Sequence, residues 1–532
     1  MVFPNRRQVL AGLGGGLLLS TRVRALRAAV PANLETKPKF ETSPFQLGVA
    51  SGDPSSDGFV IWTRLAPAPL SPDAGMTSHR PMLVSWEVGE NDTLSHIVRR
   101  GQALAHPELG HSVHVEVSGL KPDRPYWYRF RIAGYDSTIG RSHTFPLPGA
   151  SPARVRFAAA GCQYYEEGYY TAWRRIAEEP IDFVFHYGDY IYENGDSGDG
   201  IHQHNGRPFR ALRRHVGPEC YSLDEYRRRY AQYKTDADLQ AAHAAVPWIV
   251  TSDDHEVDNN WAGDSDQDGT PAEIFRLRRA SAMQAYYEHM PLRLTSLPDG
   301  SHMQIYRSLR YGDLMNIFVL DTRQYRSDQV YGDRFAGQGP DVWSPERTMM
   351  GNAQEQWLFN GLAHSDTRWN LLAHQVMMMN LAFRKSGHGP VLYSMDQWSG
   401  YMYSRRRLLQ FIEQNCPGNV VNVTGDAHRH FAGNLAYDAD DRRPVSVEFL
   451  ATSISSGADG AGDNDSFSRS VRRENPHLLA TTDQRGYVLC DVGRDVWHAD
   501  LKVLDRVMER GGRLSTYASF AVERGHPGLQ KA

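Results

Sequence analysis

The sequence predicts a mixed α/β (α+β) protein in which a small antiparallel β-sandwich precedes a larger α/β domain. The chain has 532 residues, more than one ordinary hydrophobic core needs, so two domains are expected. Short apolar runs of alternating polarity fill residues 45–145. After Ala153, apolar runs alternate with segments of helical pattern, which is typical of an α/β domain.

The first predicted domain covers residues 40–148. Its strand candidates are GFVIWTRL from Gly58, MLVSWEVG from Met82 and YWYRFRIAG from Tyr126. The segment around Tyr126, GLKPDRPYWYRF, resembles the tyrosine corner of fibronectin type III domains, although Tyr126 fits an ordinary alternating core equally well. We therefore expect a fibronectin type III-like β-sandwich that ends at the Pro- and Gly-rich segment 146–153.

The second predicted domain covers residues 153–505. Beyond the strands that carry the candidate site, strand candidates are LMNIFVLD from Leu314, WNLLAHQ from Trp369, VSVEFLATSI from Val445 and GYVLCDV from Gly486. Ser222 and Glu225 form a capping box that predicts a helix start. A C-terminal tail follows at residues 506–532, and its segment LSTYASFAVERG from Leu514 has helical character.

Residues 1–32 resemble a twin-arginine signal peptide. Arg6 and Arg7 precede an apolar stretch from Val9 to Leu19, and three further arginines follow it. This stretch is only about half the length of a membrane-spanning helix, so we expect no permanent membrane span. The leader predicts the twin-arginine export machinery as a partner and a periplasmic or secreted protein.

Charge and cysteine content narrow the functional classes. The 58 basic and 62 acidic side chains give a net charge of -4, so no specific nucleic-acid partner is expected. Cys162, Cys220, Cys416 and Cys490 are too widely spaced for a disulfide scaffold. We expect Cys162 to be functional and the other three to be buried apolar residues or to include one bridge.

Residue types that bind metals follow four of the apolar runs. They are Cys162 after VRFAAAG, Asp189 and Tyr192 after IDFVFHYG, Asp253 and Asn259 after VPWIVTS, and Asp426 and His428 after VVNVTG. A single aspartate after a strand is usually a helix cap or a turn residue. Four such strand ends together instead predict a hydrolytic metal centre, because ligands bind at the carboxyl ends of strands in open α/β sheets.

The side chains indicate two kinds of metal. A tyrosine has an ordinary pKa of about 10, so ionising it at neutral pH requires a strongly Lewis-acidic ion such as Fe(3+). Cys162, Asp189, Tyr192 and His428 suit that ion. Asp253, Asn259 and Asp426 are oxygen ligands that suit a second, divalent cation, for which Ca(2+) is the best candidate, with Asp189 bridging the two metals. Asp254 could share the role of Asp253, and Asn260 could replace Asn259.

These residues carry a resemblance to the alkaline phosphatase D (PhoD-like) family of the metallophosphatase superfamily. It extends from about Phe45 to about Cys490 and includes the motifs GCQYYEEGYYTAWR, FHYGDYIYE, VPWIVTSDDHEVDNNWA, VLDTRQYR and TGDAH. The resemblance implies a four-layer αββα catalytic domain, an Fe(3+) and Ca(2+) centre, and hydrolysis of phosphomonoesters or phosphodiesters. It also implies that a C-terminal helix can cover the active site.

Two further residues are candidates for catalysis. His255 lies beside the ligand carboxylates and could protonate the leaving group or hold a phosphate oxygen. Its alternative role is a hydrogen bond that orients Asp253 or Asp254. Arg323 follows another strand and could contact phosphate, or it could pair with Asp321 or another structural acid.

Three alternative functions remain open from the sequence. A phospholipase D-type phosphodiesterase is close to the main hypothesis and differs only in substrate. A non-catalytic calcium-dependent binding protein would not need Cys162 or Tyr192. A dinuclear iron oxidoreductase is disfavoured because the second site is rich in oxygen ligands and the Glu-x-x-His pairs of bundle-type diiron proteins are lacking.

Overall fold

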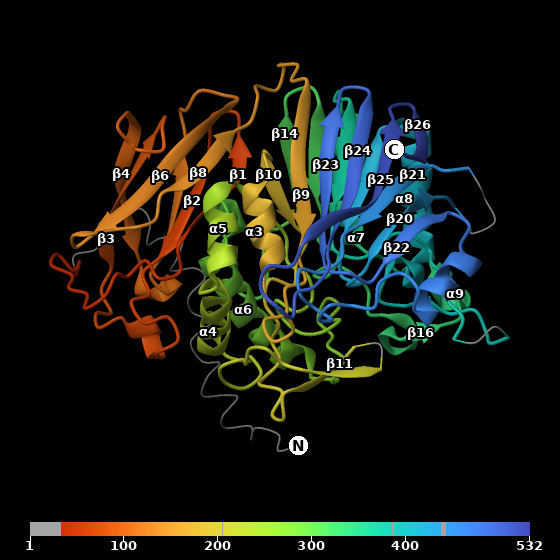
Figure 1. Ribbon diagram of the computed structural model, residues 1–532, viewed down its shortest axis with the longest axis horizontal. Helices are drawn as coiled ribbons and strands as arrows, with labels where there is room; N and C mark the ends of the chain where they lie inside the picture. The colour runs from red at the N-terminus through yellow and green to blue at the C-terminus, as the bar shows by residue number, and fades with distance from the viewer. Residues whose placement is uncertain (1–32, 205, 386–387, 438–442) are drawn as a thin grey trace.

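The computed structural model describes residues 33–204, 206–385, 388–437 and 443–532. Two large β-sheets pack face to face, and helices cover the outer face of each sheet (Figure 1). This confirms the expected αββα arrangement with a preceding β-sandwich. The predicted leader, residues 1–32, lies outside the described residues.

The first sheet has ten strands. Their order across the sheet is β26 (His526–Lys531), β25 (Leu514–Glu523), β24 (Val496–Leu504), β23 (Gly486–Gly493), β9 (Arg154–Ala160), β10 (Phe183–His186), β13 (Trp248–Val250), β1 (Val49–Ser55), β2 (Gly58–Arg64) and β5 (Ser112–Val117). The central strands β9, β10 and β13 are parallel. Both faces of these strands are buried, which explains their continuous apolar sequences.

The second sheet has seven strands and also has a parallel centre. Its order is β14 (Arg307–Tyr311), β15 (Met315–Val319), β17 (Trp369–Ala373), β19 (Val420–Thr424), β21 (Ser446–Leu450), β20 (His430–Leu435) and β22 (Leu478–Thr482). Side chains such as Phe157 and Phe185 of the first sheet and Ile317 and Val421 of the second share one core between the sheets. The strands predicted from Leu314, Trp369, Val445 and Gly486 are thus confirmed.

Helices form the two outer layers. The helices over the first sheet are α3 (Thr171–Glu178), α4 (Leu223–Lys234), α5 (Ala237–Ala245) and α6 (Ala272–His289), and those over the second are α7 (Gly351–Ala363), α8 (Met402–Asn415) and α9 (Ser466–Glu474). The predicted capping box at the start of α4 is present, because Ser222 and Glu225 each accept a hydrogen bond from the other's backbone N–H. None of the helices in the described part of the chain has the length and apolar character that a bilayer crossing requires.

The N-terminal sandwich shares a sheet with the catalytic domain, which the sequence did not predict. Its second sheet contains β4 (Ile97–Ala105), β3 (Met82–Gly89), β6 (Arg124–Ile132), β7 (Tyr135–Asp136) and β8 (Gly140–Thr144). Its first sheet is β1, β2 and β5, which continue the ten-stranded sheet through a pairing of Gly52 with Trp248. The expected tyrosine corner is present, because the Tyr126 hydroxyl accepts from the Lys121 N–H at 3.0 Å.

The C-terminal tail forms strands, so the prediction of a helix from Leu514 is wrong. Residues Leu514–Glu523 form β25, which pairs with β24, and β26 follows as the edge strand. Alternate residues Phe520 and Val522 are buried between the two large sheets. This period of two, together with the turn at Gly525, favours a strand pair over the expected helix.

Two short two-stranded antiparallel sheets lie near the carboxyl ends of the strands. They are β11 (Ile201–His204) with β12 (Arg207–Arg210), and β16 (Phe335–Ala336) with β18 (Tyr393–Ser394). Both emerge on the side of the molecule toward which β9 points (Figure 1). The loops that could form a site therefore gather at one end of the two sheets.

Candidate metal centre

The predicted ligands lie just beyond the ends of parallel strands from both sheets. Cys162 follows β9, Asp189 and Tyr192 follow β10, Asp253 and Asp254 follow β13, and Asp426 and His428 follow β19. Cys162, Asp189, Tyr192, Asp253 and Asp254 are buried, whereas Asp426, His428 and Asn259, which also follows β13, are partly exposed. The structure thus brings together four segments that are far apart in the sequence, as predicted.

The backbone is strained at four of these residues. Cys162, Asp189, Asp426 and His428 have φ values of 50°, 54°, 68° and 55°, in the left-handed region that residues with a Cβ rarely adopt. Such conformations cost on the order of 1–3 kcal/mol each and cluster at functional sites. Their presence at these strand ends is independent support for a site there.

Glycines allow the strand ends to approach one another. A Cβ atom on Gly425 would lie 2.1 Å from the ring of Tyr187, and one on Gly188 would lie 2.3 Å from the Cβ of Asp253. The Tyr187 hydroxyl donates to the carbonyl of Thr452 at 2.7 Å, which fixes the ring between these segments. Any larger residue before Asp189 or Asp426 would therefore push these predicted ligands apart.

A first group of donors surrounds Tyr192. Candidate ligand atoms of Cys162, Asp189 and His428 all lie within 4.8 Å of one another. The Tyr192 hydroxyl lies 2.9 Å from both Asp189 Oδ2 and His428 Nε2, and 2.7 Å from Ser456 Oγ. Burial and the nearby Asp189 carboxylate raise the pKa of Cys162 and of Tyr192 well above their ordinary values. A cation at this point is what would allow the thiol and the phenol to ionise.

A second group is made of carboxylates. Ligand atoms of Asp253, Asp254 and Asp426 lie within 4.8 Å of one another, as do those of Asp189, Asp254 and His255. Burial raises the pKa of Asp426 to about 7. Among the described residues, the buried oxygens Asp189 Oδ1 and Asp253 Oδ2 find no hydrogen-bond partner. Buried carboxylate oxygens without partners are costly, and a bound cation would satisfy them.

Asp254 belongs to both of these clusters, the one with Asp253 and Asp426 and the one with Asp189 and His255. It is therefore at least as well placed as Asp253 to bind a metal. Its Oδ2 accepts from the Asn260 N–H at 2.7 Å, and burial is outweighed by the charges of Arg323 and His255, which lower the pKa of Asp254. Asn259 and Asn260 both line the adjacent cavity. The side chain of Asn259 donates to Gln267, and that of Asn260 donates to Asp333.

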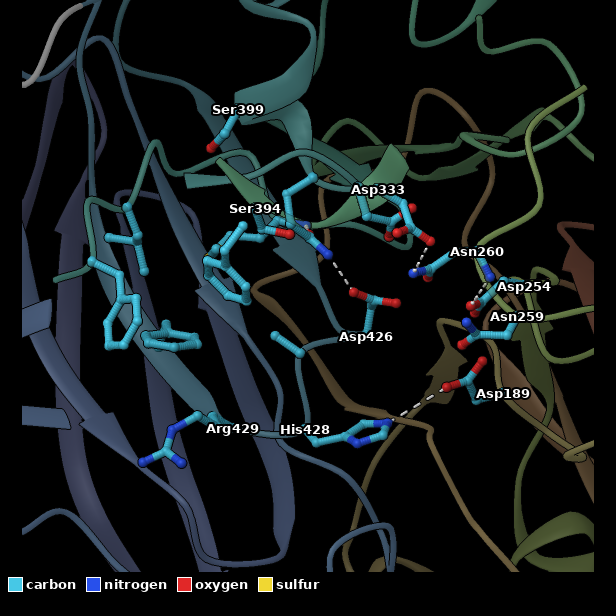
Figure 2. Close-up of a pocket in the computed structure, with 18 of the residues that line it drawn as sticks. Asp189, Asp254, Asn259, Asn260, Asp333, Ser394, Ser399, Asp426, His428 and Arg429 are labelled. Atoms are coloured by element: carbon cyan, nitrogen blue, oxygen red, sulfur yellow. Dashed lines mark hydrogen bonds and ion pairs between the residues drawn. The ribbon is translucent and has the colours of Figure 1, made fainter. Parts of the chain in front are cut away.

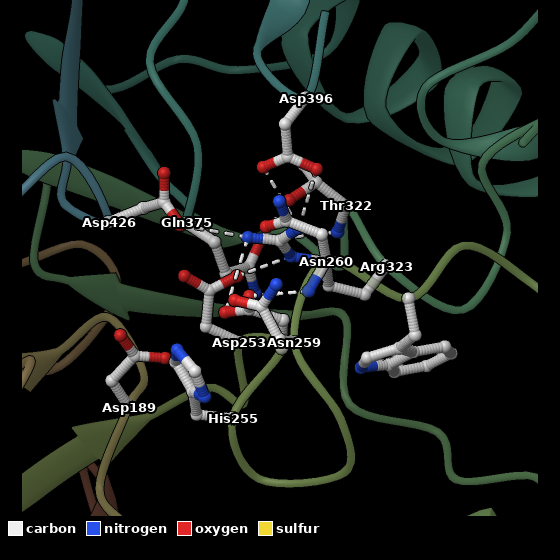
Figure 3. A network of polar contacts seen from close by, with 12 residues as sticks. Asp189, Asp253, His255, Asn259, Asn260, Thr322, Arg323, Gln375, Asp396 and Asp426 are labelled. Carbon is white, nitrogen blue, oxygen red and sulfur yellow. Dashed lines mark hydrogen bonds and ion pairs between the residues drawn. The ribbon is translucent and has the colours of Figure 1, made fainter. Parts of the chain in front are cut away.

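Arg323 is buried among the carboxylates and does not line the cavity. Its Nε donates to Asp253 Oδ1 at 2.5 Å, its Nη1 to both oxygens of Asp396 at 3.1 Å, and its Nη2 to Asp426 Oδ1 at 2.9 Å (Figure 3). Burial would lower the pKa of Arg323, but these carboxylates raise it well above its ordinary value. Of the two predicted roles, this geometry corresponds to pairing with structural acids, although the side chain of Asp321 is not among the partners of the guanidinium.

His255 faces both the first group and the cavity. Its Nδ1 lies 2.7 Å from Glu193 Oε2, and its ring packs against the ring of Tyr192 with centroids 4.1 Å apart. Burial would lower the pKa of His255, but Glu193, Asp254 and Asp189 raise it well above the ordinary value. The contact with Glu193 and the packing against Tyr192 hold the imidazole in one orientation.

Several supporting residues were not predicted. Glu256 accepts hydrogen bonds from the N–H groups of Asp189, Tyr190 and Asp253 at 3.1, 2.5 and 2.7 Å, and so ties the end of β10 to the end of β13. Gln397 donates to Asp426. Glu256 could have been suspected from its place in the DDHE sequence, whereas Gln397 lies in a loop without a strand pattern.

The donors open onto a cavity of about 330 Å³. Asp189, Asp254, Asn259, Asn260 and Asp333 lie on one side of it, and Asp426 and His428 lie between them and a set of aromatic rings (Figure 2).

All four cysteines are buried and unbridged, so the optional disulfide does not form. Cys162 alone among them lies in a ligand group of the described chain.

Comparisons with known proteins agree with this geometry. The model of the family described as "PhoD-like phosphatase" matches residues 157–501, and that of its N-terminal domain matches residues 29–146. Alkaline phosphatase D of Bacillus subtilis (strain 168) is 45% identical over 524 residues, which cover 98% of this chain and 87% of that protein. A solved structure titled "Structure of PhoD" superposes with a TM-score of 0.88 at 46% identity and covers 93% of both chains.

Proposed function

Because the chain belongs to the PhoD-like phosphatase family and is a phosphoester hydrolase, we propose that it acts outside the cytoplasm on phosphomonoesters or phosphodiesters with an iron and calcium centre. The observation that supports the metal centre most strongly is that candidate ligand side chains converge from four strand ends. Two of these side chains, Asp189 and Asp253, each have a buried carboxylate oxygen without a hydrogen-bond partner. Family membership argues against the non-catalytic calcium-binding alternative.

The donor chemistry supports the two predicted ions. Cys162, Asp189, Tyr192 and His428 would hold Fe(3+), since thiolate and phenolate ligands favour a strongly Lewis-acidic ion. Asp253, Asn259 and Asp426 would hold Ca(2+), together with Asp254. When bound, the metals would supply Lewis acidity toward water and the phosphoryl group.

His255 would protonate the leaving oxygen. It is held by Glu193, its pKa is raised by the neighbouring carboxylates, and it lines the cavity where the substrate would lie. Arg323 would act indirectly, because its three nitrogens hold Asp253, Asp396 and Asp426 in fixed positions. A direct contact of Arg323 with phosphate stays a prediction.

Export by the twin-arginine route remains part of the proposal. It rests on Arg6, Arg7 and the apolar stretch after them, all within residues that the structure does not describe. Cell fractionation of the wild type and of a variant carrying Arg6→Lys and Arg7→Lys tests it. Retention of the variant in the cytoplasm supports the route, and unchanged export would contradict it.

The central experiment combines elemental analysis with turnover. Protein exported and purified without chelator should contain near-stoichiometric iron together with calcium, and should hydrolyse p-nitrophenyl phosphate or bis(p-nitrophenyl) phosphate. The rates on these two esters and on phosphatidylcholine, at identical metal loading, separate phosphatase from phosphodiesterase and phospholipase D-type activity.

Two cysteine variants provide the matched comparison. Cys162→Ser should lose iron and turnover together, whereas Cys416→Ser should keep both, because Cys416 is buried in the apolar core of α7, α8 and the second sheet. Full activity of metal-free protein, or iron retained by Cys162→Ser, would contradict the proposal.

A further inference from the structure

One half of the active-site cavity is apolar. Opposite the carboxylates, six side chains from the second sheet, its loops and α9 line the cavity: Phe335, Met377, Leu381, Phe383, Phe431 and Phe467. Aromatic rings lie on the far side of Asp426 from Asp189, Asp254 and Asn259 (Figure 2). The phosphoryl chemistry assigned above uses none of these residues.

Three phenylalanines form the outer part of this apolar wall. Phe335 on β16 packs against Phe383 with ring centroids 5.7 Å apart, and Phe383 packs against Phe467 on α9 at 5.0 Å. Phe335 lines the cavity and is 48% exposed, so much of its ring is left uncovered by its ring partners. The wall therefore presents apolar surface to the cavity that the folded chain itself does not cover.

The only cation lining this half is already engaged. Of the described residues that line the cavity, Arg429 is the one arginine or lysine, and its guanidinium forms ion pairs with Asp465 and Asp483. Its guanidinium also lies 5.2 Å from the ring centroid of Phe467, so it supports the wall. A second anionic group of a substrate would find no uncommitted positive charge there.

The cavity is also larger than a phosphoryl group requires. Its volume of about 330 Å³ falls at the lower end of the about 300–1,000 Å³ of pockets that hold drug-sized molecules. With the phosphoryl group against the carboxylate side, the remaining space is bounded by the apolar wall. An apolar group attached through the ester oxygen would fill it and remove water from it.

We propose that the enzyme selects phosphoesters whose organic group is apolar, an alkyl or aryl group that packs against Phe335, Phe383 and Phe467. The proposal rests on the proposed function, since it places phosphorus at the carboxylate side of the same cavity. Each methylene buried there is expected to improve binding about fourfold, the equivalent of about 0.8 kcal/mol.

Calorimetric titration with non-hydrolysable probes tests this selection. Methyl-, propyl- and hexylphosphonate are titrated into full-length, metal-loaded protein, with 3-hydroxypropylphosphonate as a polar probe of similar size to propylphosphonate. We expect the Kd to fall at least tenfold from methyl- to hexylphosphonate, and the hydroxylated probe to bind more weakly than propylphosphonate. Equal Kd values across the series, or no binding of any probe, would overturn the proposal.

Variants locate the effect on the wall. The ratio of the Kd for methylphosphonate to the Kd for hexylphosphonate should fall below about threefold in Phe383→Ala and in Phe467→Ala. Phe383→Leu should retain most of this ratio. Phe359→Ala is the matched control, because Phe359 packs against Phe411 and does not line the cavity. A ratio that survives in both alanine variants would place the selection elsewhere and overturn the proposal.

The test also separates this proposal from the proposed function. Turnover of p-nitrophenyl phosphate and bis(p-nitrophenyl) phosphate is measured on the same protein. Absence of turnover with a chain-length-dependent Kd would refute the hydrolase mechanism and leave the apolar subsite in place. Turnover with a Kd independent of chain length would refute the subsite alone.

Discussion

Replacement of Arg323 by methionine should destabilise the metal-free protein by about 3–5 kcal/mol, the usual cost of removing one partner from a buried ion pair. Arg323 and Asp253 are fully buried, and the guanidinium contacts Asp253 at 2.5 Å and Asp426 at 2.9 Å. Asp396 keeps a second cation in Arg326, at 2.7 Å. The loss therefore falls on Asp253 and Asp426, whose carboxylates would remain buried without a positive partner.

Thermal unfolding followed by circular dichroism measures this loss. At about 2 °C per kcal/mol for a large chain, the Tm in the presence of chelator should fall by about 6–10 °C. With metals bound the fall should be smaller, because the cations supply positive charge beside the same carboxylates. Arg154→Met is the control, since its ion pair with Asp491 is 61% exposed on the arginine side and should matter little. A fall in Tm below about 2 °C, or an equal fall with and without metals, would show that Arg323 does not stabilise the fold through these carboxylates.

Three further predictions follow from the site and its surroundings. Tyr192→Phe should lose the visible absorption of a tyrosinate–iron complex and most of the bound iron, and a spectrum like that of the wild type would exclude Tyr192 as a ligand. His255→Gln should lower kcat by about 10²–10⁴-fold on alkyl phosphates and less on p-nitrophenyl phosphate, whose leaving group needs little protonation. Because the His255 pKa is raised, wild-type activity should decline as the pH rises through that pKa, and the variant should lack this decline. His202 lies 2.9 Å from both Glu166 and Glu167, and these hydrogen bonds raise its pKa to about 9. Protonated His202 contributes its full stabilisation of the fold below its unfolded pKa of about 6.5, and this contribution is lost as the pH rises through about 9. His202→Gln should therefore lower the Tm at pH 6 and have little effect on it at pH 10.

The convergence of the strand-end residues was predictable because buried parallel strands have a recognisable sequence. Cys162, Asp189 and Asp426 each follow an apolar run and a glycine, and the carboxyl ends of such strands meet at one edge of a sheet. The order of strands within each sheet was not needed for this inference. Local sequence was therefore sufficient to identify which residues meet.

Other parts of the site depend on contacts that have no local pattern. Asp396 and Gln397 reach the carboxylates from a loop more than 65 residues beyond Arg323 in sequence, and nothing near them indicates a strand end. The role of Arg323 was ambiguous for the same reason, since its partners come from three other segments.

The errors in the fold have a similar origin. Leu514–Glu523 contains residues that tolerate a helix, but pairing with β24 decides its structure. The junction between the sandwich and the catalytic domain depends on Gly52, where a Cβ atom would lie 2.5 Å from the carbonyl oxygen of Pro291. Such a close approach between segments 239 positions apart has no signature in either segment alone.

A crystal structure of the metal-loaded protein, with anomalous diffraction measured at the iron absorption edge, would test the proposed metal centre itself. We predict one iron peak within bonding distance of Cys162 Sγ, Asp189, Tyr192 Oη and His428 Nε2, the atoms that already converge in the fold. An iron peak bound elsewhere, or fully loaded and active protein with no iron at these four residues, would contradict it.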